Sequence, residues 1–146
     1  MTQRSQNFVS LNDHLCFSIY TTSRAIQRMY RPLLDDLNLT YPQYLTLVAL
    51  WENGPQTVSQ LGNKLDLDSG TLTPMLKRME KANLIVRHRD VMDERVVLVE
   101  LTEKGKRMQA DSAIIPQTLL EKSGLDSDEW HTLNKTMKKL IVHVSE

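Results

Sequence analysis

The 146-residue sequence predicts a mainly α-helical protein with one small β-ribbon, an α+β arrangement. Apolar side chains recur every three or four residues in residues 67–80, as they do on one face of a helix. A helix-start signal at Thr57 and Gln60 predicts a shorter helix just upstream. Residues 84–89 and 96–101 then alternate in the manner of strands. The order helix, turn, helix, ribbon predicts a winged helix-turn-helix.

An apolar stripe at helical spacing predicts a long helix near the N-terminus. Its members are Leu11, Leu15, Ile19, Ile26, Met29, Leu33 and Leu37. Pro32 is expected to bend or end this helix, because proline cannot donate the helical hydrogen bond. Thr40 and Gln43 then have the spacing of a capping box and predict the start of the next helix.

The helix-turn-helix itself is predicted from caps and buried faces. The Thr57 hydroxyl and the Gln60 side chain can each satisfy a free amide at the start of its first helix. Leu61 and Leu65 supply the buried face of that helix, and residues 66–68 turn the chain into the second one. The second helix is expected to bury Leu72, Met75, Leu76 and Met79.

Three positions affect the backbone of the second helix. Pro74 is expected to make the first turn from Ser69 irregular, because its ring crowds the carbonyl group of Gly70. Gly70 leaves room for that irregularity, or alternatively lets a phosphate approach the backbone closely. Asn83 is a suitable helix exit, since asparagine tolerates the left-handed conformation.

The exposed face of the second helix combines short hydroxyl side chains with two cations. These residues are Ser69, Thr71, Thr73, Lys77 and Arg78. Such a face suits a DNA groove, where hydroxyl groups reach bases or phosphates and cations displace counterions. The alternative is an ordinary amphipathic helix with a solvated face, and such helices are common.

The ribbon in residues 84–101 forms the predicted wing. Arg95, at its polar tip, suits a narrow minor groove, where negative potential is concentrated. Asp93 is expected to orient Arg95 rather than to touch DNA. Arg87 and Arg89 lie on the first strand and are candidate phosphate contacts. The alternative, given equal weight, is that both are solvated surface charges with no role in DNA binding.

The C-terminal region predicts two further helices. Residues 102–122 are expected to form one helix with a kink at Pro116, and Asp126 and Glu129 predict the start of the last. An apolar seam with steps of three and four follows along Trp130, Leu133, Met137, Leu140 and Val144. Together with the N-terminal helix, these helices predict a two-fold homodimer with two DNA-reading heads, which matches a pseudo-palindromic operator. Packing within one protomer is the alternative.

Composition is consistent with a single domain that binds DNA. The formal net charge is zero, with 18 Lys and Arg against 18 Asp and Glu. Residues 77–89 nevertheless hold five cations and one acid, whereas residues 111–146 hold six acids and four lysines. No apolar run approaches membrane-spanning length and no signal peptide is evident, so a cytoplasmic protein without membrane association is expected.

Cys16 is the single cysteine of the chain. It lies one position beyond Leu15 of the apolar stripe, so partial burial at the flank of the helix is expected. An intramolecular disulfide is excluded, and an isolated intracellular cysteine is more often an inert small apolar residue than a reactive one. The four histidines are dispersed, so no metal and no cofactor are expected.

The order of elements, with the Asp93-Glu-Arg95 tip, resembles the MarR-type winged-helix regulators. Leu15-Cys-Phe-Ser-Ile-Tyr20, Leu39-Thr-Tyr-Pro-Gln-Tyr44 and residues 67–80 resemble the organic-hydroperoxide-responsive repressors of that family, the OhrR subfamily. The resemblance covers about residues 11–144. It implies one domain over residues 1–146. Its parts would be a winged helix-turn-helix in residues 40–102, a wing at about 84–101, and dimerisation helices in 1–38 and 103–146.

The resemblance also implies that Cys16 is a peroxide-reactive thiol held by the hydroxyl groups of Tyr30 and Tyr41. Tyr20, one helical turn beyond Cys16, would line the same pocket. Tyr30 lies roughly 21 Å along a straight helix from Cys16, so the contact requires a bend or the partner protomer, and the partner is favoured. Ordinary interface packing is the alternative for both tyrosines.

The implied function is a repressor that leaves its operator when an organic hydroperoxide oxidises Cys16. No second cysteine follows, so the route would run through a sulfenic acid to a mixed disulfide with a low-molecular-weight thiol. A MarR-type regulator gated by a phenolic ligand or another oxidant is the alternative. A thiol peroxidase is disfavoured because no resolving thiol is present, and a protein–protein module remains open. The chain is therefore expected not to be an enzyme.

Overall fold

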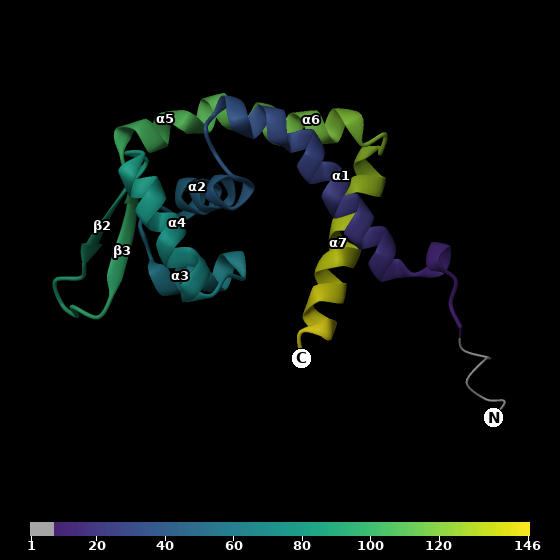
Figure 1. Cartoon of the computed structure of the whole chain (residues 1–146), viewed down its shortest axis with the longest axis horizontal. Coiled ribbons are helices and arrows are strands. Elements are labelled where there is room, and N and C mark those ends of the chain that lie inside the picture. The colour runs from purple at the N-terminus through teal and green to yellow at the C-terminus, as the bar shows by residue number, and fades with distance from the viewer. Residues whose placement is uncertain (1–7) are drawn as a thin grey trace. The chain divides into compact units, whose positions relative to one another are not determined.

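The computed structural model describes residues 8–146 and forms two compact units, Met1–Ala113 and Ile114–Glu146 (Figure 1). The first unit contains a short 3-10 turn, η2 (Leu11–Asp13), followed by helices and strands. These are α1 (Leu15–Asp36), α2 (Tyr41–Asn53), β1 (Gln56–Thr57), α3 (Val58–Leu65), α4 (Ser69–Lys81), β2 (Ile85–Arg89), β3 (Val97–Leu101) and α5 (Glu103–Ser112). The second unit contains α6 (Ile114–Lys122) and α7 (Ser127–Val144).

The predicted winged helix-turn-helix is present in the first unit, as α3, α4 and the β2–β3 ribbon. The two wing strands are antiparallel, with Ile85 opposite Leu101 and Arg89 opposite Val97. A third strand, β1, pairs with the other edge of β3 and gives the order β1-β3-β2. The sequence did not predict β1, because two residues are too few to show an alternating pattern.

A leucine-rich core fixes α4 against the rest of the unit. Leu47 and Leu50 from α2, Leu61 from α3, and Leu72 and Leu76 from α4 are each no more than 1% exposed. Burying one such side chain stabilises a fold by about 1.5–3 kcal/mol. Met79, Ile85 and Val99 extend the same core towards the wing and are equally well buried. The inward stripe predicted for the second helix is therefore confirmed.

The predicted caps begin the helices where the sequence placed them. The Gln43 amide donates to Thr40 Oγ1 (3.3 Å) and the Thr40 amide donates to Gln43 Oε1 (3.0 Å). Thr57 and Gln60 form the same reciprocal pair at 2.9–3.0 Å. Asn83 has a φ of +62°, as expected of a helix exit.

Pro32 lies inside α1 and does not end it, since the helix continues to Asp36, while the bend expected at Pro32 stays a prediction. The irregular first turn expected from Pro74 was wrong, because α4 is helical from Ser69 onwards. Each proline removes one helical hydrogen bond, to the carbonyl group of Arg28 or Gly70. Both of those residues are exposed, so water can satisfy the freed carbonyl group.

The single helix predicted for residues 102–122 is two helices. α5 ends at Ser112 and α6 begins at Ile114, so the break precedes the expected kink. Pro116 occupies the first turn of α6, where the missing amide has no helical partner to lose. Proline is thus compatible with the start of α6 and does not bend a longer helix.

The last helix begins as predicted, with the reciprocal capping box of Asp126 and Glu129 at 2.8–2.9 Å. None of the residues of α7 is buried in the protomer. Leu133 and Val144 of the predicted seam are 48% and 71% exposed.

Within residues 8–146, no helix combines the length and apolar character that a membrane span requires.

Candidate nucleic-acid interface and thiol site

The α4 helix presents its polar face outwards. Its start is fixed by Asp68, whose Oδ1 accepts a hydrogen bond from the Thr71 amide at 2.8 Å. The buried stripe on the other side fixes the rotation of the helix about its axis. Of the predicted DNA contacts on α4, Thr73 is half-buried and the others are exposed, namely Ser69, Thr71, Lys77 and Arg78. The hydroxyl groups and cations thus share one accessible surface.

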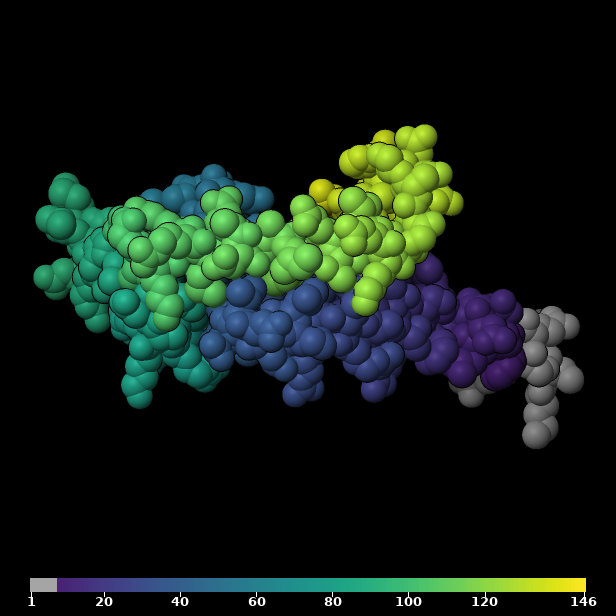
Figure 2. Space-filling model, turned by 90° about the horizontal axis from the view of Figure 1, so that it is seen from above, coloured from purple at the N-terminus to yellow at the C-terminus, as the bar shows by residue number. Residues whose placement is uncertain are grey.

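The wing tip carries an exposed and oriented cation. The Arg95 guanidinium donates to both carboxylate oxygens of Asp93, at 3.1 and 3.3 Å, while the side chain of Arg95 is 91% exposed. These hydrogen bonds from Arg95 lower the pKa of Asp93. Arg89 Nη1 donates to the Glu94 carbonyl oxygen at 2.7 Å and ties the tip to the strand. Figures 1 and 2 show the β2–β3 ribbon projecting from the body of the first unit.

Arg87 faces α4 instead of solvent. Its Nη2 and its backbone amide donate to the two carboxylate oxygens of Glu80, at 3.1 and 3.0 Å, and its side chain is 20% exposed. The side-chain and backbone hydrogen bonds from Arg87 lower the pKa of Glu80. This ion pair fastens the wing to α4. The sequence showed both charges but gave no signal for the pair, because it joins a helix to a strand.

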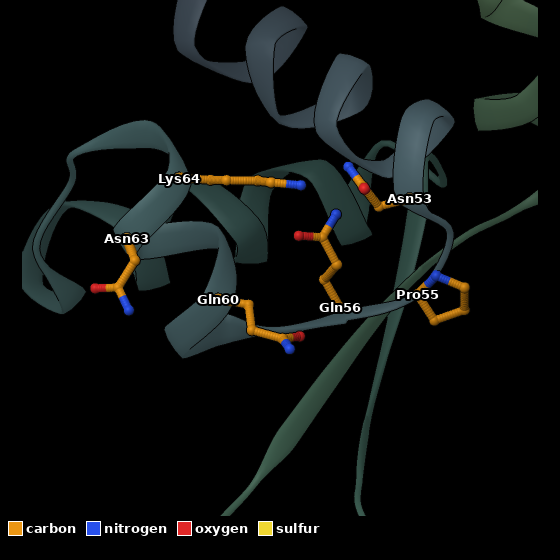
Figure 3. Close-up of a pocket in the computed structure, with 6 residues that line it drawn as sticks. All are labelled: Asn53, Pro55, Gln56, Gln60, Asn63 and Lys64. Atoms are coloured by element: carbon orange, nitrogen blue, oxygen red, sulfur yellow. The ribbon is translucent and has the colours of Figure 1, made fainter.

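An open hollow of about 530 Å³ lies where α2, β1 and α3 meet (Figure 3). Lys64 extends towards Asn53 and Gln56, while Asn63 points away from them. Two of the side-chain amides already make hydrogen bonds within the protein. Those of Asn53 and Gln56 both donate to the Ala49 carbonyl oxygen, at 3.2 and 2.8 Å. Gln60, also on its edge, belongs to the capping box of α3. The described lining contains no Ser, Cys, His, Asp or Glu side chain, so it offers no acid–base pair for catalysis.

A row of aromatic rings joins α1 to α2. The Tyr30 and Tyr41 ring centroids are 5.6 Å apart, Tyr41 and Tyr44 follow at 6.2 Å, and Tyr44 and Trp51 at 6.4 Å. Tyr30 is 5% exposed, and burial, followed by the neighbouring Tyr41 and Tyr44, raises its pKa to about 12. Burial also raises the pKa of Tyr41. Both phenols are therefore neutral hydrogen-bond donors at neutral pH.

Two members of this row were missed from the sequence. Tyr44 and Trp51 stand three and ten residues after Tyr41, which places all three on one side of α2. The spacing of these three aromatic residues could have predicted from the sequence that they share one face of the helix. Trp51 also donates from its indole nitrogen to the Gly105 carbonyl oxygen at 2.9 Å, a contact between α2 and α5 that no local pattern shows.

Cys16 is exposed, so the expectation of partial burial was wrong. None of residues 15–25 is buried, and Leu15 and Tyr20 are 58% and 57% exposed. Helix α1 is unbroken between Cys16 and Tyr30, which separates them by roughly 21 Å along the axis. The structure brings Tyr30 to Tyr41 within one protomer, but not to Cys16.

Tyr20 lies on the same side of α1 as Cys16, one turn further along. Its ring packs under the guanidinium of Arg24, 5.5 Å from the ring centroid, and Arg24 Nη1 donates to its hydroxyl group at 3.5 Å.

Within residues 8–146, no group of three or more His, Cys, Asp or Glu side chains could hold a metal ion.

Comparison with known proteins supports this fold. Residues 28–112 match the family model of the transcriptional regulators SarA/Rot. The organic hydroperoxide resistance transcriptional regulator of Bacillus subtilis is 47% identical over 133 residues, covering 91% of this chain and 90% of that protein. The regulator MgrA of Staphylococcus aureus is 38% identical and covers 90% of each chain. The relatives are transcriptional regulators, which confirms that the chain resembles regulators and not enzymes.

A solved structure of reduced AbfR bound to DNA superposes over the full length of both chains, with a TM-score of 0.82 and 35% identity. AbfR has also been solved as an overoxidised form bound to DNA and as a disulfide form. The disulfide form superposes with a TM-score of 0.65, at 36% identity over 97% of this chain and 99% of that one.

Proposed function

Because the chain belongs to the winged-helix transcriptional regulators of the MarR and SarA/Rot type, we propose that it is a peroxide-sensing repressor. It binds a pseudo-palindromic operator as a homodimer and leaves it when an organic hydroperoxide oxidises Cys16. The observation that carries the proposal is the contact between two neutral phenols, the buried Tyr30 and the half-buried Tyr41. The role of the Bacillus subtilis relative as an organic hydroperoxide resistance regulator supports the choice of oxidant.

DNA binding rests on α4 and the wing. The exposed hydroxyl groups and cations of α4 enter the major groove, and Arg95 reaches the adjacent minor groove. Arg89 contributes a positive charge beside a phosphate. Arg87 acts indirectly, because its ion pair with Glu80 sets the angle between the wing and α4. The DNA-bound form of AbfR supports this use of the fold.

The sensor is assembled across two protomers. The unbroken helix α1 keeps Cys16 far from the phenols of its own chain, and its exposed apolar residues need a cover. A two-fold pairing of α1 helices places Cys16 of one protomer beside Tyr30 and Tyr41 of its partner. The apolar seam of α7 contributes to the same dimer.

The chemistry begins with the Cys16 thiolate, which is the reactive form of a cysteine. Its sulfur attacks the distal peroxide oxygen, the O–O bond breaks, and the alkoxide takes up a proton and leaves as an alcohol. The product is a sulfenic acid. A low-molecular-weight thiol then attacks this sulfur and releases water, leaving a mixed disulfide. The added group does not fit between the protomers, so the spacing of the two α4 helices changes and DNA is released.

Fluorescence anisotropy on the DNA upstream of the gene tests the proposal. The wild-type protein should bind tightly and lose at least tenfold in affinity after one equivalent of cumene hydroperoxide with a small thiol. Cys16→Ser should bind the DNA equally well and keep that affinity after peroxide treatment, because the hydroxyl group is a far weaker nucleophile. Binding that survives oxidation of the wild type, or a response retained by Cys16→Ser, would reject the sensor assignment.

A further inference from the structure

The turn between β2 and β3 carries two adjacent apolar side chains that the protomer leaves uncovered. Val91 and Met92, here called the apolar tip, are 96% and 93% exposed, the highest values among the large apolar side chains of residues 8–146. Isolated apolar residues are ordinary on a protein surface, but this pair stands at the end of a projecting ribbon. Figure 1 shows the ribbon and the start of α1 at opposite ends of the first unit. A dimer formed through that half of α1 therefore leaves the apolar tip exposed.

Hydrogen bonds hold the turn that carries the apolar tip. The Met92 amide donates to Asp90 Oδ1 at 2.7 Å, and the Asp90 amide donates to the Val96 carbonyl oxygen at 2.8 Å. The Val96 amide in turn donates to the Asp93 carbonyl oxygen at 3.0 Å. A turn fixed in this way loses little conformational entropy when it binds a partner, so the contacts of its side chains contribute more fully to affinity.

Charge alone does not bring this turn to DNA. Residues 89–95 contain two arginines and three acidic residues, so their formal charge is −1. The Arg89 guanidinium is bonded to the Glu94 carbonyl oxygen, and the Arg95 guanidinium is paired with the Asp93 carboxylate. Because DNA phosphates repel acidic side chains, the electrostatic attraction at this turn is weak. A wing that binds DNA through this turn needs a further, apolar contribution.

The minor groove of DNA can provide that apolar contact. Met92 directly precedes Asp93, whose carboxylate holds the Arg95 guanidinium at 3.1 Å, so the apolar tip accompanies Arg95 into the groove. The minor groove is about 6 Å wide, which is too narrow for a helix but admits the side chains of a turn. Methionine and other apolar side chains can insert between base steps from this groove and partly unstack them.

We propose that the apolar tip enters the minor groove beside Arg95 and partly unstacks one base step there. The proposal rests on the DNA-binding part of the proposed function and is independent of the peroxide sensor. Pyrimidine–purine steps such as TA unstack most easily. The wing thus makes operator preference depend on the flexibility of a step, in addition to the contacts of α4 with the bases.

Anisotropy titrations of the reduced, full-length protein on the DNA upstream of the gene test the contact. The double variant Val91→Thr/Met92→Gln keeps the approximate shape of both side chains but makes them polar, so affinity should fall about tenfold. The slope of log affinity against log salt should stay unchanged, because no cation is removed. Thermal unfolding should also stay unchanged, since both side chains are exposed.

Val86→Thr is the matched control. Val86 is 43% exposed on the same ribbon, but it lies opposite Glu100 and outside the turn. It should therefore bind DNA as the wild-type protein does. An equal loss of affinity in Val86→Thr would overturn the assignment to the apolar tip.

Unstacking has its own readout in the DNA. Hydroxyl-radical footprinting, which reports on the minor groove, locates the wing on each half-site. The fluorescence of 2-aminopurine placed at that step should rise about twofold or more on binding of the wild-type protein, because unstacking relieves its quenching. The double variant should produce a much smaller rise.

Two operators of equal composition test the dependence on the base step. A TA step at the wing position should bind the wild-type protein severalfold more tightly than an AT step, and the double variant should lose this preference. A contact made by Arg95 alone predicts the opposite order, because stiff A-tracts without a TA step have the narrower groove.

The outcomes separate this proposal from the proposed function. Full affinity in the double variant would overturn it and favour a protein as the partner of the apolar tip. A loss of affinity with a reduced salt slope, or without any rise in fluorescence for the wild type, would overturn the insertion. DNA binding that survives oxidation would reject the sensor and leave these results intact. Absence of DNA binding by the wild type would reject both proposals.

Discussion

Tyr30 owes its chemistry to its surroundings and not to its residue type. A tyrosine on a helix surface ionises near pH 10, but Tyr30 is 5% exposed and packs against Tyr41. Burial disfavours the phenolate, so the hydroxyl group remains a donor over the whole physiological range. A donor of this kind stabilises an adjacent thiolate without competing for its charge.

The raised pKa predicts how stability depends on alkaline pH. The unfolded chain ionises at the ordinary value of 10.0 and the folded state resists ionisation up to about 12. The contribution of Tyr30 is therefore complete below pH 10 and lost as the pH rises towards 12, by the order of 1–3 kcal/mol. Urea unfolding between pH 9 and 11.5 should show the decline, and Tyr30→Phe should flatten it. An equal decline in Tyr30→Phe would contradict the assignment.

Arg95 is an exposed charge at the wing tip that is held in place by Asp93, and it is the proposed minor-groove contact. Arg95→Ala should weaken operator binding about three- to tenfold. It should also reduce the slope of log affinity against log salt by about one, since one fewer counterion is displaced. Anisotropy titrations at several salt concentrations measure both quantities. Arg107→Ala on α5 serves as the control, and an unchanged salt slope in Arg95→Ala would exclude the wing contact.

At the scale of elements, close approaches between backbones set how the helices meet. Gly105, near the start of α5, is buried, and a Cβ atom there would collide with the Leu84 carbonyl oxygen. The Trp51 indole bonds to the carbonyl group of the same glycine. The junction of α2, α5 and the wing thus depends on the absence of a side chain at one position.

Gly105→Ala should therefore lower the free energy of unfolding by about 2 kcal/mol or more, as overpacking at a rigid contact does. Gly70→Ala is the matched variant. At Gly70 the nearest atom to a new Cβ is Asp68 Oδ1 at 3.4 Å, and alanine favours the helix by up to about 1 kcal/mol. Thermal or urea unfolding should move in opposite directions for the two variants. A neutral Gly105→Ala would show that the contact can relax.

At the scale of the whole molecule, the proposed sensor requires two chains. Mixed dimers of two variants test whether the sensor needs both chains. Cys16→Ser and Tyr30→Phe each lack one component, so each homodimer should respond poorly to peroxide. A mixed dimer contains one complete site if Cys16 meets Tyr30 across protomers, and none if they meet within one protomer.

Mixing equal amounts of the two variants under exchange conditions should therefore restore peroxide-dependent loss of the single Cys16 thiol in each mixed dimer, which after random exchange is about half of all Cys16 residues. Quantitative thiol titration measures that fraction, with each homodimer alone as the control. No recovery after mixing, with exchange verified by mass, would place the contact within a protomer and contradict the dimeric sensor.

Local sequence patterns were sufficient to predict the order of the elements and most helix starts. Capping boxes at Thr40, Thr57 and Asp126 join residues three positions apart, so the signal and the structure it specifies lie in one short segment. The apolar stripe of α4 was readable for the same reason. The resemblance to peroxide-responsive repressors likewise rested on short motifs, including the one around Cys16.

Which of these residues meet depends on packing between elements. This packing pairs Tyr30 with Tyr41, turns Arg87 towards Glu80 and adds β1 to the wing, whereas Cys16 stays exposed on the first half of α1. Each of these outcomes depends on contacts between different elements, which the packing of the core selects. Local patterns specify a helix and its faces, but the neighbour of each face is chosen by the burial of the whole unit.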